Sequence, residues 1–431
     1  MKNNFIKSTI ILILGGLITK VLGMVIKIAL TRAVTTKGIG LYSLILPTFN
    51  LFITLCSLGL PVAISKLISE GGKNNKKIVL STMPIMLIVN ILLIVIIFLL
   101  APILSHTLLG NDNTYYPILA IGMTLPFICL SSILKGYFFG KEKMLEATTS
   151  NIFEQIVRLV LTVFLIPLLI KYSLVVAITG VVLINVVSEA CSIIVLLLFM
   201  PKGKKITFDD FKYDSCILKE VLSISMPTVG SRLIGSISYF LEPIILTYTL
   251  LRNGYTNDYI TMEYGIINGY VYPLLLLPSF FTLAISNALM PVVSNSYTNH
   301  RYDYTKYKIK QAIILSLIIG VPCTLLFMTI PDIFLDLIYN TNEGINYIKV
   351  IAPIFLLFYI QGPLTTSMQG MDMAHEAMIG TLLGAIIKSI LLFILAYMNF
   401  GIWALLISNI VNIIFITIHH YYYVFKQFKK T

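Results

Sequence analysis

The sequence is poor in charge for its length. Only 12% of its 431 residues are Asp, Glu, Lys or Arg, whereas 57% are hydrophobic. Soluble domains carry about 25% charged residues. A soluble chain of this length would also divide into two or three cores joined by polar linkers. The small charged fraction therefore excludes an ordinary soluble protein.

Cysteine chemistry and nucleotide-binding motifs are also lacking. No two of the five cysteines form a CxxC pair, and the five histidines show no metal-ligand spacing. This excludes a disulfide framework and a zinc site. We find no Walker loop, no nucleophile motif and no carboxylate or histidine cluster at an interface. We therefore expect that the protein does not hydrolyse ATP, is not an enzyme and binds no cofactor. His419 and His420 are expected to face the membrane interface.

What the sequence has instead is long apolar runs, each able to span a bilayer, which takes about 20 residues. They are continuous rather than alternating, which favours helices over a barrel. The run from Ile10 to Leu30 is too long for a signal-peptide core, so we interpret it as an uncleaved first helix. The predicted spans are 8–30, 41–65, 79–104, 116–139, 150–170, 174–200, 218–250, 264–293, 309–330, 347–367, 377–398 and 401–424.

The loop charges predict the orientation. If the N-terminus is inside, the inner segments carry 21 Lys and Arg, including Lys135, Lys141 and Lys143, and the outer loops carry five. Positive residues accumulate on the cytoplasmic side. We therefore expect a multi-pass protein of the inner (cytoplasmic) membrane with both termini in the cytoplasm. The net charge of +12 is assigned to these loops and to anionic lipid rather than to nucleic acid.

The two halves of the chain form a weak repeat. A shift of 230 residues places Gly140 on Gly370, Glu146 on Glu376 and Arg158 on Lys388, and a shift of 212 places Lys20 on Arg232. Parallel repeats of this kind enclose a central path. We predict an all-α polytopic fold of about twelve helices in two six-helix lobes around a central cavity. The lobes are 1–200 and 218–431, with a cytoplasmic linker at 201–217.

The first span carries Lys20 and Lys27 on the same helix face as Gly16 and Gly23. Charged residues in a span are costly at about 2.5–3.5 kcal/mol each on insertion scales. They should therefore line a wet cavity or find partners. The alternative is that these lysines reach towards the membrane interface, above all Lys27, which lies nearer the outer end.

The seventh span carries Arg232 and Glu242, which share a face. Ten residues of helix separate them by about 15 Å, so they cannot easily neutralise each other. Each needs a partner on another helix or a ligand.

The fifth, sixth and eleventh spans carry the remaining charges. Glu154 and Arg158 are four residues apart and can pair locally. Lys388 is the repeat mate of Arg158. The residue four positions before it, which corresponds to Glu154, is Gly384, so Lys388 has no acid nearby on its own helix. Glu189 could neutralise a cavity cation or carry a proton or sodium ion.

These charges predict a net positive cavity. Its substrate-binding cations are Lys20, Lys27, Arg158, Arg232 and Lys388, and its charge-balancing or ion-coupling acids are Glu154, Glu189 and Glu242. A positive pocket in a low-dielectric wall favours an anion, and Arg and Lys are the usual phosphate partners. A polyprenyl-pyrophosphate head group fits this site, whereas a cationic drug fits it poorly.

An ordered set of motifs along the chain resembles the stage V sporulation protein B group of polysaccharide-biosynthesis proteins. This group belongs to the multidrug/oligosaccharidyl-lipid/polysaccharide exporter (MOP) superfamily and is related to lipid II flippases and MATE transporters. The motifs are Gly38–Tyr42, Gly59–Lys66, Lys135–Gly140, Glu154–Arg158, Gly230–Gly235, Phe240–Pro243, Leu277–Phe280, Ile348–Pro353 and Gln361–Pro363.

The resemblance implies two six-helix lobes, alternating access and export of a lipid-linked peptidoglycan precursor, with a role in spore cortex assembly in sporulating bacteria. Lys20 matches a basic cavity position of lipid II flippases, whereas the next basic position falls on Ile26, beside Lys27. Members of the group usually continue into two more helices. If those helices form part of the lipid path in relatives, the path here is expected to differ.

We therefore expect a flippase for an anionic lipid-linked oligosaccharide. Membrane potential, H⁺ or Na⁺ would drive it. Its expected partners are the lipid bilayer, the polyprenyl-pyrophosphate-linked sugar and cell-wall synthesis enzymes. A multidrug or metabolite exporter of the same fold and a non-transporting scaffold for wall synthesis are the alternatives.

Overall fold

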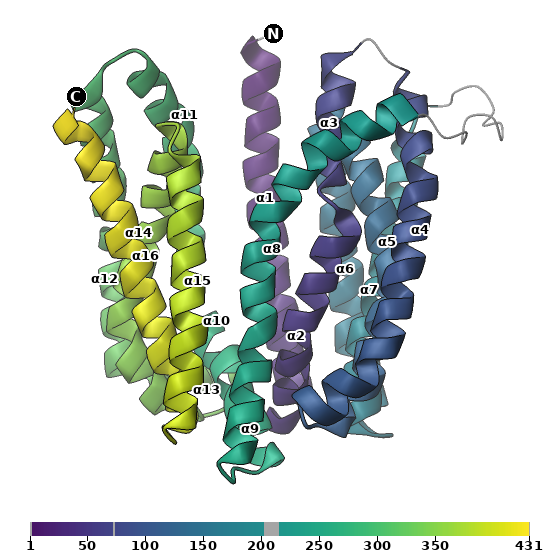
Figure 1. The fold of residues 1–431 in the computed structure, drawn as a ribbon, viewed down its shortest axis with the longest axis vertical. Helices are drawn as coiled ribbons and strands as arrows, with labels where there is room; N and C mark the ends of the chain where they lie inside the picture. Colours follow the sequence, from purple (N-terminus) through teal and green to yellow (C-terminus); the bar gives the residue numbers. More distant parts are fainter. Residues whose placement is uncertain (1, 72–73, 202–214, 431) are drawn as a thin grey trace. The chain divides into compact units, whose positions relative to one another are not determined.

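A computed structural model describes residues 2–71, 74–201 and 215–430. Within these ranges every regular element is a helix (Figure 1). The first half contains α1 (Lys2–Ala33), α2 (Thr36–Ser57), α3 (Leu60–Glu70), α4 (Asn75–Pro102) with a π-helical end (Ile103–Leu108), a 3₁₀ turn (Asp112–Thr114), α5 (Tyr115–Gly140), α6 (Met144–Leu169) and α7 (Leu174–Phe199). The second half contains α8 (Ser215–Arg252), α9 (Asn257–Gly265), a π-helical segment (Ile266–Val271), α10 (Tyr272–Leu275), α11 (Ser279–Thr298), α12 (Tyr302–Thr329), α13 (Pro331–Tyr339), α14 (Ile345–Gly370), α15 (Ala374–Tyr397) and α16 (Trp403–Lys430).

Polar residues start several of these helices by capping free backbone N–H groups. Side chains of Thr35, Asn74, Ser173 and Thr256 accept from the first turns of α2, α4, α7 and α9. Such caps are typically worth about 1 kcal/mol. The helix starts are therefore encoded locally, in loops between apolar runs.

Two predicted spans are broken rather than straight. The span predicted at 41–65 divides into α2 and α3 at Leu58 and Gly59, whose φ angles of 41° and 64° lie in the left-handed region. The span predicted at 264–293 becomes a pair bent by 54°, Asn257–Leu275 and Ser279–Thr298. Pro278 lies at this bend, and proline lacks the N–H that would continue the helical hydrogen bonds.

The described part of the chain has 11 helices long and apolar enough to cross a membrane, or 12 if the bent pair is one span. Large apolar side chains on α4 face outward, with Leu87, Ile88 and Phe98 between 61% and 65% exposed. A soluble protein rarely leaves such a stripe uncovered, whereas lipid covers it without penalty. The prediction of an all-α polytopic membrane fold is confirmed.

The chain forms two compact units, Met1–Phe240 and Leu241–Thr431. The division falls inside α8, whereas the sequence predicted lobes of 1–200 and 218–431. Most of the predicted linker at 201–217 lies outside the described residues. The unit boundary thus assigns Arg232 to the first unit and Glu242 to the second.

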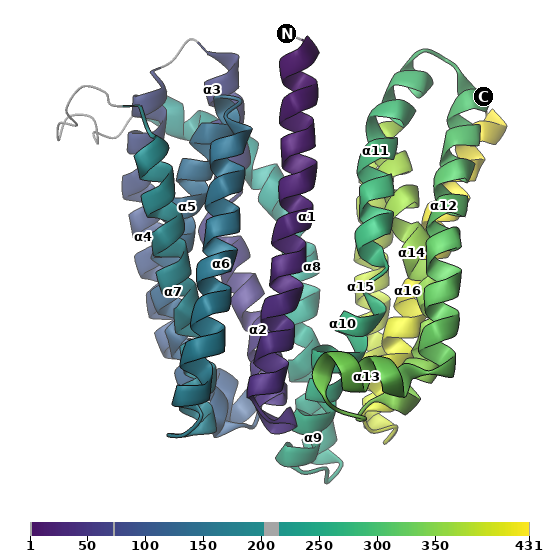
Figure 2. The ribbon, with the colours of Figure 1, turned by 180° about the vertical axis from the view of Figure 1, so that it is seen from behind.

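In the first unit, α5 packs against α2, α3, α4 and α7, and α6 packs against α1 and α7 (Figure 2). The approach of α3 to α5 depends on small residues. A Cβ on Gly136 would lie 2.9 Å from Pro61 Cα, and one on Gly140 would lie 2.7 Å from Ser65 O. Any larger residue would push these helices apart.

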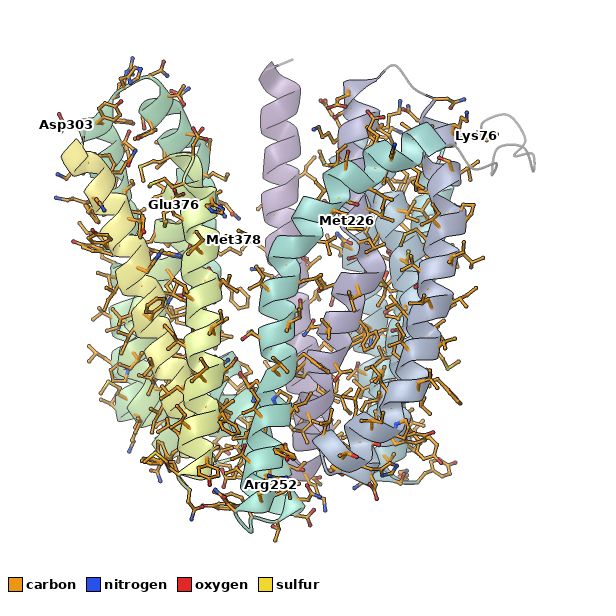
Figure 3. The ribbon with its side chains drawn as sticks, in the orientation of Figure 1. Lys76, Met226, Arg252, Asp303, Glu376 and Met378 are labelled. Carbon is orange, nitrogen blue, oxygen red and sulfur yellow. The ribbon has the colours of Figure 1, made fainter. Side chains whose placement is uncertain are left out.

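In the second unit, α14 is central and packs against α11, α12 and α16, while α15 packs against α16. Asp303, near the start of α12, and Arg252, the last residue of α8, lie at opposite ends of this unit (Figure 3). His420 is only 1% exposed. The expectation that it faces the interface is wrong, because α16 turns this ring towards α14 and α15, where it contacts Thr365 and Ala377.

The repeat inferred from sequence has a local structural counterpart. Gly140 ends α5 and Gly370 ends α14. Two residues later Glu142 and Asp372 have φ angles of 57° and 61°. A short turn then leads into α6 in one half and into α15 in the other. The shift of 230 residues therefore relates two turns of the same backbone form.

Candidate functional site

The first unit contains a cavity of about 410 Å³ bounded by α1, α2, α5, α6 and α7. Polar and charged side chains enter it from four of these helices. They include Lys27 of α1, Asn50 of α2, Glu154 and Arg158 of α6, and Glu189 of α7. Four of the eight predicted site residues therefore share one cavity.

A buried ion network forms one wall of this cavity. Arg158 Nη2 lies 2.7 Å from Glu154 Oε1, and Lys135 Nζ lies 3.0 Å from Glu154 Oε2. Lys135 Nζ also lies 3.9 Å from Glu189 Oε2. The two carboxylates are 8% and 10% exposed, so the network is largely removed from water. Opposite charges in such a medium attract strongly and hold one another in place.

Arg158 is oriented further by α7. Its Nε and Nη2 both donate to Ser188 Oγ at 3.4 Å. The local Glu154–Arg158 pair that the sequence left open is thus present, and it is part of a larger network that joins α5, α6 and α7.

Lys135 is the site residue that sequence reasoning missed. The loop charges place Lys135 among the cytoplasmic cations, because it is near the end of the fourth predicted span. In the structure it lies within α5, and its side chain is only 16% exposed. The signal that could have found it is its distance of five residues from Gly140, more than one turn inside the helix.

The second unit contains a separate buried pair. Lys388 Nζ of α15 contacts Glu242 Oε2 of α8, and Tyr264 Oη donates to Glu242 Oε1 at 3.0 Å. Glu242 is 4% exposed and Tyr264 is fully buried. Glu242 therefore has its partners on other helices. This agrees with the sequence prediction, because Arg232 is too far along the same helix to neutralise Glu242. Lys388 is not an unpaired cation, because its acid comes from a helix distant in sequence.

Lys20 and Arg232 behave differently from the other predicted cations. Both are exposed: Lys20 lies within the candidate span Leu14–Ala33 of α1, and Arg232 is the first residue of the candidate span Arg232–Arg252 of α8. Among the residues that the structure describes, neither makes an ion pair. Their charges are therefore available to a ligand or to water, unlike those of Arg158 and Lys388. The eight predicted residues thus divide between one cavity, one separate pair and two exposed positions.

Comparison with known proteins places this architecture in a family. Residues 5–297 match the model of the polysaccharide biosynthesis protein family, and residues 271–430 match a second model of the same description. The chain belongs to the polysaccharide biosynthesis protein family. It is 33% identical to stage V sporulation protein B of Bacillus subtilis (strain 168), over 97% of this chain and 83% of that protein.

Two further similarities concern the sequence of a flippase and the fold of a transporter. The chain is 22% identical to the lipid II flippase MurJ of Bacillus subtilis (strain 168), over 91% of this chain and 77% of that protein. Its fold resembles the inward-facing conformation of a multidrug resistance MATE family transporter of the MOP superfamily. The TM-score is 0.73 at 16% identity, covering 96% of this chain and 95% of the other. The chain is thus a multi-pass membrane protein of the polysaccharide biosynthesis protein family, and its fold is that of the MATE transporter.

Proposed function

We propose that this protein flips an anionic lipid-linked oligosaccharide across the cytoplasmic membrane, and that the substrate is the peptidoglycan precursor lipid II. The lipid II flippase and the sporulation protein among its relatives support this substrate class. In this proposal the lipid tail stays in the bilayer while the pyrophosphate meets protein cations. The two halves alternate between inward and outward states, with both termini in the cytoplasm.

One observation carries the proposal. Lys20 is exposed within the first candidate span, and Arg232 is exposed at the start of the candidate span of α8. The two are repeat mates under the 212-residue shift, so the first span of each half presents a cation. A charge within or at the end of a membrane span, without an acidic partner, is unfavourable unless it meets water or an anion. A pyrophosphate, with its several oxygen acceptors, satisfies both an ammonium and a guanidinium.

The driving force in this proposal is the membrane potential or an ion gradient. Glu154 and Glu189 are the acids of the first-unit cavity, and Glu189 Oε2 makes no hydrogen bond within the described residues. A carboxylate oxygen in this position can take up a proton or a sodium ion. Coupling of this kind predicts that E189Q slows gradient-driven flipping and spares slow equilibration without a gradient.

Flipping in vesicles tests the proposal. Purified protein would be placed in liposomes with a fluorescent polyprenyl-pyrophosphate-linked disaccharide, and the fraction accessible to an impermeant quencher would be followed over time. We expect wild-type flipping and at least a tenfold loss in the K20Q/R232Q double variant. K171Q, which removes an exposed cation between α6 and α7, is the matched control and should keep the wild-type rate.

The rival functions give different results. No flipping by the wild type, or equal rates in the double variant, would overturn the proposal. Efflux of a cationic dye would favour a drug exporter. A scaffold predicts that K20Q/R232Q cells build normal wall while loop variants do not.

A further inference from the structure

The second unit has a pocket of about 660 Å³ that the flipping proposal does not use. It is bounded by α9, by the loop before α14, by the first residues of α14 and by the start of α16. These elements lie at the end of the unit away from the C-terminus, where Figure 2 shows α9 and α13. Its volume is within the range of small-molecule sites, about 300–1,000 Å³.

The walls combine aromatic rings with carboxylates. Tyr259, Tyr347 and Trp403 supply the rings, and Glu263 and Glu343 supply the acids. No Lys, Arg or His is among its lining residues in the part of the chain that the structure describes. In a chain of net charge +12 this pocket is an acidic exception.

The rings and one acid are fixed by contacts with each other. Tyr347 Oη donates to Glu263 Oε2 at 2.6 Å, which directs both side chains. The Tyr347 ring packs edge-on against Trp403, with centroids 5.2 Å apart. Such pairs hold their geometry before a ligand arrives, which lowers the entropy lost on binding.

The loop over the pocket is held in place as well. Gly344 has a φ angle of 93°, a conformation that favours glycine. A Cβ there would lie 2.8 Å from Val271 Cγ2 and 3.0 Å from Ile266 Cγ2. The loop that carries Glu343 is therefore packed directly on the helical segment beneath it, and the acid is held at the rim.

We propose that this pocket binds an organic ammonium group, with Glu263 and Glu343 as counterions and the rings of Tyr259, Tyr347 and Trp403 as the surrounding faces. Aromatic faces attract cations through the negative potential at the centre of the ring. A nearby carboxylate adds its own electrostatic attraction for the same cation. An anion is disfavoured, because its charge would meet two carboxylates. This binding site is separate from the cations assigned to flipping, so either proposal can fail alone.

Trp403 makes the test direct, because it is the only tryptophan in the chain. Its fluorescence would be followed in detergent-solubilised full-length protein during titration with tetramethylammonium or n-butylammonium. Neopentyl alcohol and n-butanol are the uncharged counterparts, and N-acetylglucosamine tests a neutral sugar. We expect a saturable change with the two ammonium ions alone, and weaker binding as salt concentration rises.

Variants identify the groups responsible. E263Q and E343Q should each weaken ammonium binding about tenfold, the change that 1.4 kcal/mol of lost attraction gives. In E263Q the amide oxygen can still accept from Tyr347, so the pocket keeps its shape. Y259S should weaken binding by removing a partly exposed ring.

D372N is the matched control, since Asp372 is an exposed acid at the far end of α14, about 35 Å of helix from Tyr347. It should bind like the wild type. An absent ammonium response would overturn the proposal, as would an equal response to the alcohols or the sugar, or wild-type binding by both Gln variants.

Discussion

Lys135 and Arg158 contact opposite oxygens of the Glu154 carboxylate, at 3.0 and 2.7 Å. One acid on α6 thus neutralises a cation from α5 and another from its own helix. Removing one member of a buried ion group leaves the others without compensation, which is more damaging than the loss of a surface pair.

We expect E154Q to lower the free energy of unfolding by about 3–5 kcal/mol, because the partly buried Arg158 loses this counterion and Lys135 keeps only Glu189, 3.9 Å away. Unfolding of the purified protein, followed by helical circular dichroism, measures this. E146Q is the control, since its partner Lys143 is 44% exposed and lies 3.6 Å away. Its loss should be within about 1 kcal/mol. Equal stability of the two variants would contradict the network.

The Lys388–Glu242 pair predicts strong non-additivity. K388M leaves Glu242 buried with only the Tyr264 hydroxyl, so it should destabilise the protein by about 3–5 kcal/mol. In K388M/E242Q no uncompensated charge remains, and stability should recover by at least 1 kcal/mol relative to K388M. Additive losses in the double-mutant cycle would show that the two side chains do not depend on each other.

Gly380 predicts a steric limit between α15 and α16. A Cβ at this position would lie 2.3 Å from His419 Nδ1, so G380A should destabilise the second unit by about 1–3 kcal/mol. Shortening the opposing side chain in G380A/H419A should restore most of that loss. In G235A the new methyl group meets nothing within 4 Å. That control should match the wild type or gain up to about 1 kcal/mol from helix propensity.

The orientation inferred from loop charges can be measured with single cysteines introduced into a cysteine-free background. Tyr172 is 82% exposed between α6 and α7, and Lys141 is exposed between α5 and α6. With both termini in the cytoplasm, an impermeant thiol reagent should label Y172C in intact cells. It should label K141C only after permeabilisation. The reverse pattern would invert the proposed topology.

Local sequence properties predicted much of the fold. Bilayer length, apolar composition and the need to satisfy every backbone group restrict such runs to helices. The eleventh span, predicted at 377–398, corresponds to α15 at Ala374–Tyr397. The span predicted at 264–293 includes Pro278 but does not specify the bend there, because a proline in a membrane helix can leave it straight, kinked or broken, according to its neighbours.

The candidate site was only partly predictable. Helix periodicity placed Glu154 and Arg158 on one face, and the structure shows them paired. The same method finds no acid near Lys388 on its own helix, which is correct. It does not find Glu242, the acid that pairs with Lys388 in the folded protein. Its partner is 146 residues away, and no spacing rule connects the two.

The sequence by itself determined that this chain is a helical membrane protein, and which spans carry charge. Both properties depend only on residues that are close together in the sequence. Only the tertiary structure decided which charges are neutralised and which are exposed. It buried Lys135 against Glu154, paired Lys388 with Glu242 and left Lys20 and Arg232 exposed. The energy of an ion depends on its distance to the opposite charge and to water, and helix packing sets both.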